Sequence, residues 1–72
     1  MSRIEFGFCY TQFVKEHKRE PVMATMDRRN FEFFRDVVMP EVKNSPRCYV
    51  LDDGRLSYFG IIVTIGDQFC LS

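Results

Sequence analysis

The chain has 72 residues, of which 46% are apolar, and its ten basic residues balance ten acidic ones. This length allows a single domain, residues 1–72, and the apolar fraction excludes a disordered chain. A neutral chain has no overall field that attracts nucleic acid or an anionic membrane, and no apolar run approaches the roughly 18 residues of a membrane-spanning helix.

Two strands are predicted in the N-terminal third. Apolar and other residues alternate over residues 3–10, and this period of two is typical of a strand with one buried face. The fully polar run 15–20 predicts a solvated loop. Residues 21–25 are expected to return as a short second strand, beginning at Pro21, because proline lacks the amide that a central ladder needs.

The middle of the chain predicts a helix that begins after Asp27, whose carboxylate is placed to cap the first turn. Met26 and Phe31 flank this cap at the spacing of a hydrophobic staple. The apolar stripe then recurs every three or four residues, at Phe31, Phe34, Val38 and Val42, and is widened by Phe33 and Val37. Pro40 cannot continue a regular helix, so the helix is expected to end near Met39 or to kink there.

Residues 47–71 predict an antiparallel meander of three strands. Its turns are expected at Asp53-Gly54 and at Gly66-Asp67, since glycine tolerates the positive φ of a tight hairpin turn. If both loops have two residues, Tyr49 lies opposite Tyr58. Gly60, inside the middle strand, suggests a bulge or a close approach by another group. The predicted fold is therefore α+β, with a four- or five-stranded antiparallel sheet, one helix packed on one face, and the order ββαβββ.

In this register the middle strand, residues 57–65, is apolar on both faces, and strands of this kind are normally covered on both sides. The single helix is expected to cover the face of Tyr49 and Leu51. The opposite face would then await a partner through four residues: Val50, Phe59, Ile61 and Val63. The alternative is that the N-terminal hairpin or the segment after Pro40 covers this face, and a register error of one residue would exchange the two faces.

No residues suggest an enzyme, a cofactor site or a metal site. His17 is the only histidine and lies in a charged run, and the cysteines form no C-x-x-C pair. Cys48 and Cys70 are expected to be buried and inert, and Cys9 to be the most accessible thiol. An odd number of widely spaced cysteines and the absence of a signal-peptide run predict a reducing, cytoplasmic location.

The functional hypothesis is a small non-enzymatic interaction module, either a homodimer or an inhibitor or modulator that docks on a larger assembly, of the kind that phages and mobile elements encode. The alternative is a nucleic-acid-binding module that uses a basic loop, formed by Lys15, His17, Lys18 and Arg19. Two glutamates interrupt this loop, which favours a solvated surface. A less favoured third hypothesis is an enzyme subunit that contributes one residue to a shared site.

Overall fold

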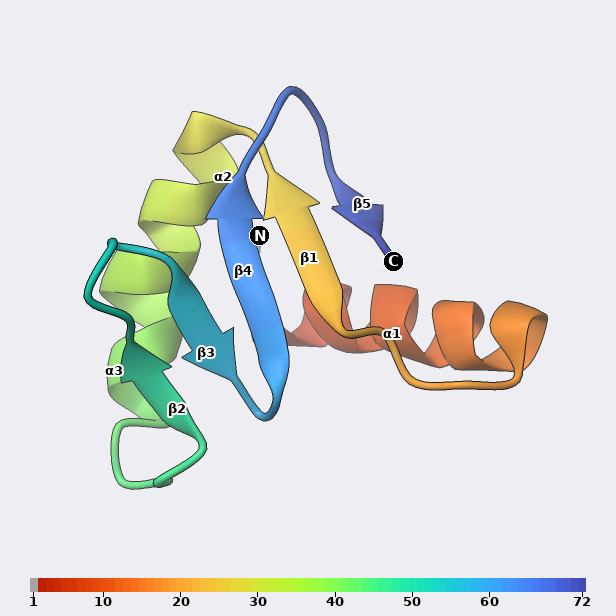
Figure 1. The fold of residues 1–72 in the computed structure, drawn as a ribbon, viewed down its shortest axis with the longest axis horizontal. Helices are drawn as coiled ribbons and strands as arrows, with labels where there is room; N and C mark the ends of the chain where they lie inside the picture. The colour runs from red at the N-terminus through yellow and green to blue at the C-terminus, as the bar shows by residue number, and fades with distance from the viewer. Residues whose placement is uncertain (1) are drawn as a thin grey trace.

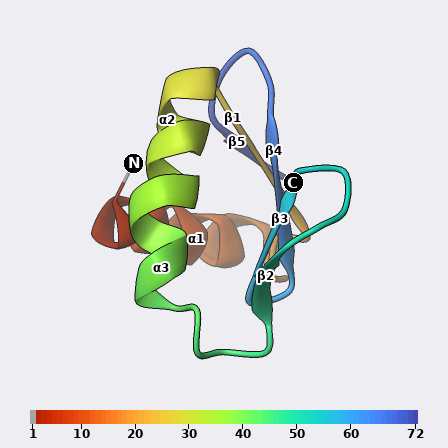
Figure 2. The same ribbon diagram turned by 90° about the vertical axis from the view of Figure 1, so that its left-hand side faces the viewer.

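Helices cover one face of a five-stranded sheet in the computed structural model, which describes residues 2–72. Figures 1 and 2 show both helical segments on the same side of the sheet. The elements follow in chain order: α1 (Arg3–His17), β1 (Met23–Met26), α2 (Arg28–Phe33), η1 (Phe34–Val38), α3 (Met39–Glu41), β2 (Cys48–Val50), β3 (Leu56–Tyr58), β4 (Ile61–Ile65) and β5 (Cys70–Leu71). We call the continuous segment α2-η1-α3 the central helix. Within residues 2–72, no helix is both long enough and apolar enough to cross a membrane.

The sheet is mixed, with the strand order β2-β3-β4-β1-β5. Strand β1 runs parallel to β4, whereas the pairs β2–β3, β3–β4 and β1–β5 are antiparallel. The α+β class is confirmed and the five strands fall within the predicted four or five, but the purely antiparallel sheet, the single helix and the order ββαβββ are wrong. The meander prediction fails at its last step, because β1 separates β4 from β5 (Figure 1).

The N-terminal segment is helix α1 and not a strand. Ser2 caps it, its hydroxyl accepting a hydrogen bond from the Glu5 amide at 3.2 Å, and Lys18 closes it in a left-handed conformation. Phe6, Tyr10 and Phe13 are spaced by four and three residues, so they share one side of the helix and pack inward. The same residues fitted a strand because a short alternating pattern does not exclude a helical one. The predicted loop 15–20 is wrong in its first half, since α1 extends to His17.

The central helix begins as predicted. The Asp27 carboxylate accepts hydrogen bonds from the Asn30 amide at 3.5 Å and from the Asn30 side chain at 2.6 Å. The helix does not end at Met39 but continues through Pro40 to Glu41. Segment η1 explains this, because the Met39 amide bonds to the Phe34 carbonyl five residues back. This wider π turn relieves the clash that the proline ring would have with the carbonyl four residues before it.

The cap at Asp27 makes the free energy of unfolding depend on pH in the acidic range. The hydrogen bond from the Asn30 side chain holds the pKa of the Asp27 carboxyl below its usual value. A depressed pKa in the folded state stabilises the fold above the unfolded-state pKa, and that contribution disappears as the pH falls below about 4. In urea titrations, wild type should exceed Asp27→Asn in stability at pH 7, and the difference should shrink at low pH. A difference that is constant with pH would contradict this assignment.

Two hairpin loops set the register of β2, β3 and β4. Between β2 and β3 the loop has three residues: the Gly54 amide bonds to the Leu51 carbonyl at 3.0 Å, and Gly54 has a φ of 91°. The extra residue places Tyr49 opposite Ser57 instead of Tyr58. The predicted middle strand is in fact two strands, β3 and β4, joined by a turn in which Phe59 and Gly60 both have positive φ.

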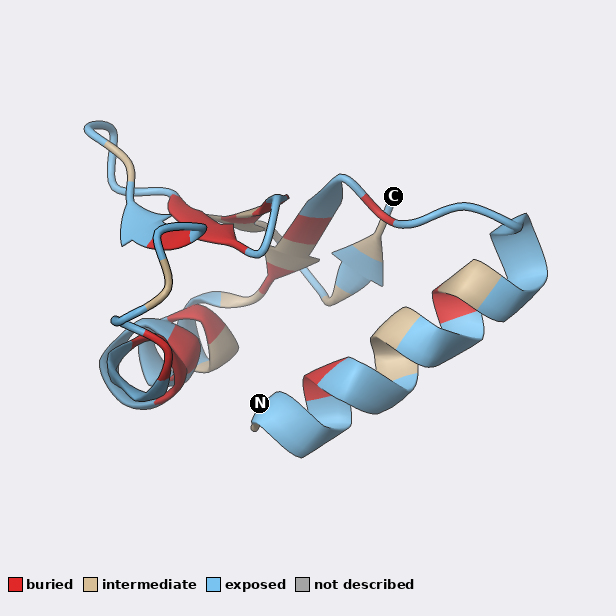
Figure 3. Ribbon diagram, turned by 90° about the horizontal axis from the view of Figure 1, so that it is seen from below, coloured by how far each residue is buried: buried red, intermediate tan, exposed pale blue. Residues whose placement is uncertain are grey.

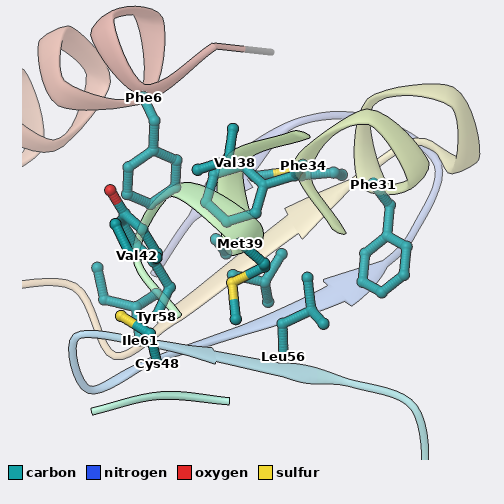
Figure 4. Packing of buried hydrophobic residues seen from close by; sticks show 13 residues of the cluster. Phe6, Phe31, Phe34, Val38, Met39, Val42, Cys48, Leu56, Tyr58 and Ile61 are labelled. Atoms are coloured by element: carbon teal, nitrogen blue, oxygen red, sulfur yellow. The ribbon is translucent and has the colours of Figure 1, made fainter. Parts of the chain in front are cut away.

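These loops reverse the faces predicted for β2 and β4, whereas Tyr58 of β3 lies under the helices as predicted. Ile61 and Val63 were expected on an uncovered face, but they are 4% and 0% exposed and lie under the helices. Figure 4 shows Phe6 reaching from α1 into the same cluster, where its ring centroid lies 5.4 Å from Phe34 and 5.3 Å from Tyr58. The central helix and α1 therefore share one core, which includes the two β4 residues that were expected on an open face.

The other face of the sheet carries no helix. The register places Tyr49, Ser57, Ile62 and Met23 in one row across it, followed by a row of Thr64, Thr25 and Cys70. The hydroxyl groups of Ser57, Thr64 and Thr25 lie among the apolar side chains on this face, as is usual for a sheet with one solvated side. The uncovered face is therefore not the apolar surface that the sequence suggested.

Candidate docking site along the first helix

Helix α1 presents the two most exposed large apolar side chains in the described part of the chain. Ile4 and Phe8 are each 74% exposed and lie one turn apart on the same side of the helix. Only Phe6 and Phe13 of α1 are buried, and Figure 3 shows the helix exposed along most of its length. Single exposed apolar residues are common on protein surfaces, so these two gain significance only from what lies beside them.

A groove of about 560 Å³ runs beside Phe8, between α1 and β5. Its lining is mostly apolar, with polar groups toward the C-terminal end of α1, and consists of Phe8, Cys9, Gln12, Phe13, Glu16, His17, Phe69, Cys70 and Leu71. Sites that bind another protein commonly have an apolar centre and a polar rim of this kind.

Aromatic contacts hold the walls of the groove in place. Phe13, 7% exposed, is the most buried lining residue, and its ring stacks on His17 with centroids 4.2 Å apart. The Arg19 guanidinium lies 5.0 Å from the centroid of the same ring, a cation–π contact. Phe69 meets Phe6 edge-on at 6.3 Å, which ties the segment before β5 to the core. The residues that line the groove are therefore held in place by contacts with one another and with the core.

The four residues predicted to bind a partner do not form one surface. Val50 is 57% exposed on edge strand β2, and Phe59 is 38% exposed in the turn between β3 and β4. Ile61 and Val63 are core residues, so binding through them would require the helices to leave the sheet. Two of the four therefore remain accessible, and they lie on different elements.

The basic residues predicted as a nucleic-acid site lie together at the C-terminal end of α1. Lys15 and His17 are in its last turn, and Lys18 and Arg19 follow directly. All four are exposed, but His17 and Arg19 are packed against Phe13. The four basic residues are therefore adjacent in the structure, and two of them, His17 and Arg19, contact Phe13, which lines the groove.

The cysteines follow the predictions in part. Cys48 is buried as expected. Cys70 is exposed on β5 where burial was expected, and Cys9 is only half-buried on α1, so Cys70 and not Cys9 is the most accessible thiol. Cys9 and Cys70 both line the groove beside β5. Among residues 2–72, no group of three His, Cys, Asp or Glu side chains is arranged to hold a metal ion. The turn role of Asp53 is confirmed, since its carboxylate accepts from the Arg55 amide at 3.1 Å and from Arg55 Nε at 2.7 Å.

Sequence reasoning missed Ile4 and Phe8 because the alternating pattern placed them on the buried face of a strand. The capping pattern of Ser2 with Glu5 was the available signal for a helix, and a helix would have separated Ile4 and Phe8 from Phe6 and Phe13.

Comparison with models of protein families, with curated proteins and with solved structures finds no match to this chain.

Proposed function

We propose that the chain is a non-enzymatic protein-interaction module that forms a homodimer through α1 and the groove beside β5. The observation that carries this proposal is Phe8, 74% exposed at an apolar groove of about 560 Å³, with the equally exposed Ile4 one helical turn before it. Burying protruding aromatic side chains in an apolar depression is the main source of affinity at protein interfaces. The proposal assigns no reaction, cofactor or metal to the chain.

A second copy is the occupant that this surface fits best. An interface about a twofold axis uses the same patch on both subunits, so the patch must contain both the protruding group and the depression that receives it. Here Phe8 protrudes at the margin of the groove formed by Phe13, Phe69 and Leu71. Helix α1 has 15 residues, about 22 Å of length, which allows two copies to pack side by side.

Charges on α1 favour an antiparallel arrangement of the two copies. Glu5 lies near the N-terminal end and Lys15 near the C-terminal end, and both are exposed. Neither takes part in an ion pair among the described residues. Antiparallel packing brings Glu5 of one copy toward Lys15 of the other, twice per dimer, whereas parallel packing sets like charges side by side.

Replacing Phe8 by aspartate should convert the dimer to a monomer without unfolding it. The side chain is mostly exposed in the isolated chain, so the charge costs little there, but at the interface it would be buried without a partner. Light scattering across a concentration series should show wild type approaching twice 8.6 kDa and the variant remaining at 8.6 kDa.

Phe33→Asp is the matched control, because Phe33 is a half-exposed phenylalanine on the central helix, away from the groove. It should leave the dimer intact. A wild-type chain that stays monomeric at high concentration would contradict the homodimer. In that case the same surface would be available to a larger protein that this chain inhibits or modulates.

The nucleic-acid alternative predicts a different response to salt and to substitutions. Binding through Lys15, His17, Lys18 and Arg19 would weaken steeply as salt rises and would be abolished by charge reversal at Lys15 and Lys18. The Phe8→Asp variant would then bind nucleic acid as wild type does. Fluorescence anisotropy with a short labelled oligonucleotide at low salt separates the two functions.

A further inference from the structure

A second depression lies on the opposite flank of α1, between the helix and the turn that joins β3 to β4. It has a volume of about 340 Å³, and its lining consists of Arg3, Phe6, Gly7, Tyr10, Glu20, Arg47, Tyr58, Phe59 and Ile61. It shares five of these residues with an adjoining hollow of about 300 Å³. This size is at the lower end of small-molecule sites. We call it the Arg47 cleft; it has no lining residue in common with the groove beside β5.

Gly7 is the first sign that the Arg47 cleft has a role. Glycine in the interior of a helix is less favourable than alanine. Close packing does not explain it here, because a Cβ at Gly7 would meet nothing within 4 Å and its backbone is ordinary helix. Gly7 therefore makes the helix less stable, and the one visible consequence of its missing side chain is that the cleft stays open. Close approach of a ligand to the backbone is a recognised reason for such a glycine.

Arg47 supplies a cation at the cleft. Its Nη2 donates to the Phe59 carbonyl at 3.0 Å, which fixes the guanidinium against the turn. Gly60 makes this position possible, since a Cβ there would lie 2.9 Å from Arg47 Nη2. No ion pair among residues 2–72 includes Arg47, and the bond to Phe59 uses one of its five N–H donors.

The other lining groups narrow the chemistry of the ligand. Four aromatic rings line the cleft, from Phe6, Tyr10, Tyr58 and Phe59. Tyr10 donates to the Glu20 carboxylate at 2.5 Å, and this hydrogen bond raises the pKa of the phenol, which therefore stays neutral at physiological pH. The Arg3 guanidinium is already paired with the Glu41 carboxylate at 3.8 Å, so Arg47 is the one lining cation without an ion pair among residues 2–72. One such cation beside the Glu20 carboxylate suits a monoanion better than a dianion.

We propose that the Arg47 cleft binds a small planar aromatic carboxylate. The aromatic lining takes the ring, and the Arg47 guanidinium takes the carboxylate through paired hydrogen bonds, for which its planar fork is suited. Gly7 leaves the space in which the ring sits. The site is independent of the proposed homodimer, because the two depressions lie on opposite flanks of α1.

The test uses benzoate as the probe and the ¹⁵N-labelled full chain. Amide signals of Gly7, Phe59 and Gly60 should shift in a saturable way, whereas benzyl alcohol, which has the ring without the charge, should bind at least tenfold more weakly. Phenyl phosphate, the dianion, should bind no more tightly than benzoate. Arg47→Gln should weaken benzoate at least tenfold, and Arg28→Gln, on the central helix outside the cleft, should not.

A second pair of variants keeps the test valid if Arg47→Gln impairs folding. Gly7→Ala should raise Tm by about 4 °C, because it removes glycine from a helix and its Cβ would meet nothing within 4 Å; Gly7→Leu should also raise Tm, because leucine is a strong helix former. Gly7→Leu should nonetheless abolish benzoate binding by filling the cleft. A gain in stability with a loss of binding cannot come from damage to the fold.

Three results would overturn the proposal. The first is the absence of saturable shifts up to about 10 mM benzoate. The second is benzoate binding that Gly7→Leu leaves unchanged. The third is equal binding of benzyl alcohol and benzoate, which would show an apolar hollow without a role for Arg47.

Discussion

Ile61→Asp should unfold the isolated chain, whereas Ile62→Asp, one residue further along the same strand, should leave it folded. Ile61 is 4% exposed and packs under the helices, while Ile62 faces the open side of the sheet. Burying an unpaired carboxylate and losing the isoleucine contacts together cost about 4 kcal/mol or more. That is comparable to the whole stability expected of a domain of this size.

The pair of variants is a direct test of the register. Far-UV circular dichroism and urea titration should show a folded Ile62→Asp and a largely unfolded Ile61→Asp at 25 °C. The register predicted from two-residue loops gives the reverse order, with Ile62 in the core. A folded Ile61→Asp variant would therefore contradict the arrangement of β3 and β4 described above.

The faces of the sheet were not predictable from the sequence because they depend on one residue of loop length. Asp53-Gly54 correctly marked a turn, and Gly54 does have positive φ. The pattern does not distinguish a two-residue loop from a three-residue loop in which glycine follows a type I turn. Since side chains alternate across a strand, this difference of one residue moved Tyr49 to the face opposite that predicted, and the unforeseen turn at Phe59-Gly60 did the same for Val63.

The central helix was predictable because its signals are local. The cap at Asp27 and the stripe of Phe31, Phe34 and Val38 depend only on residues within a few turns. The position of β1 between β4 and β5 depends instead on pairing across about 40 residues of chain, and no local pattern encodes it. The candidate docking site on α1 was missed for a related reason, since it could be located only after Arg3–His17 was known to be a helix.

The local pattern at Gly66 correctly indicated a position that needs glycine, but it gave the wrong structural reason for that need. With Asp67 it predicted a hairpin turn between adjacent strands, but β4, which ends at Ile65, pairs with β1, and β1 separates it from β5. The Gly66 amide donates to the Met26 carbonyl at 2.7 Å. A Cβ on Gly66 would lie 2.0 Å from Thr25 Cγ2, on the neighbouring parallel strand. Glycine is therefore required by close packing between β1 and the end of β4.

Gly66→Ala should destabilise the chain by about 1–3 kcal/mol, because the threonine side chain is branched at Cβ and has little freedom to move aside. Thr25→Ser removes the methyl group that the new Cβ would meet. In the Thr25→Ser background the same Gly66→Ala change should be close to neutral, since alanine also restricts the unfolded chain more than glycine does.

Urea titration of wild type, both single variants and the double variant measures the coupling between the two positions. We expect a coupling free energy of at least about 1 kcal/mol, with the double variant more stable than Gly66→Ala by itself. Additive effects would mean that Thr25 and Gly66 do not touch. Because this contact exists only if β1 lies parallel to β4, the cycle tests a strand pairing that local sequence patterns did not foresee.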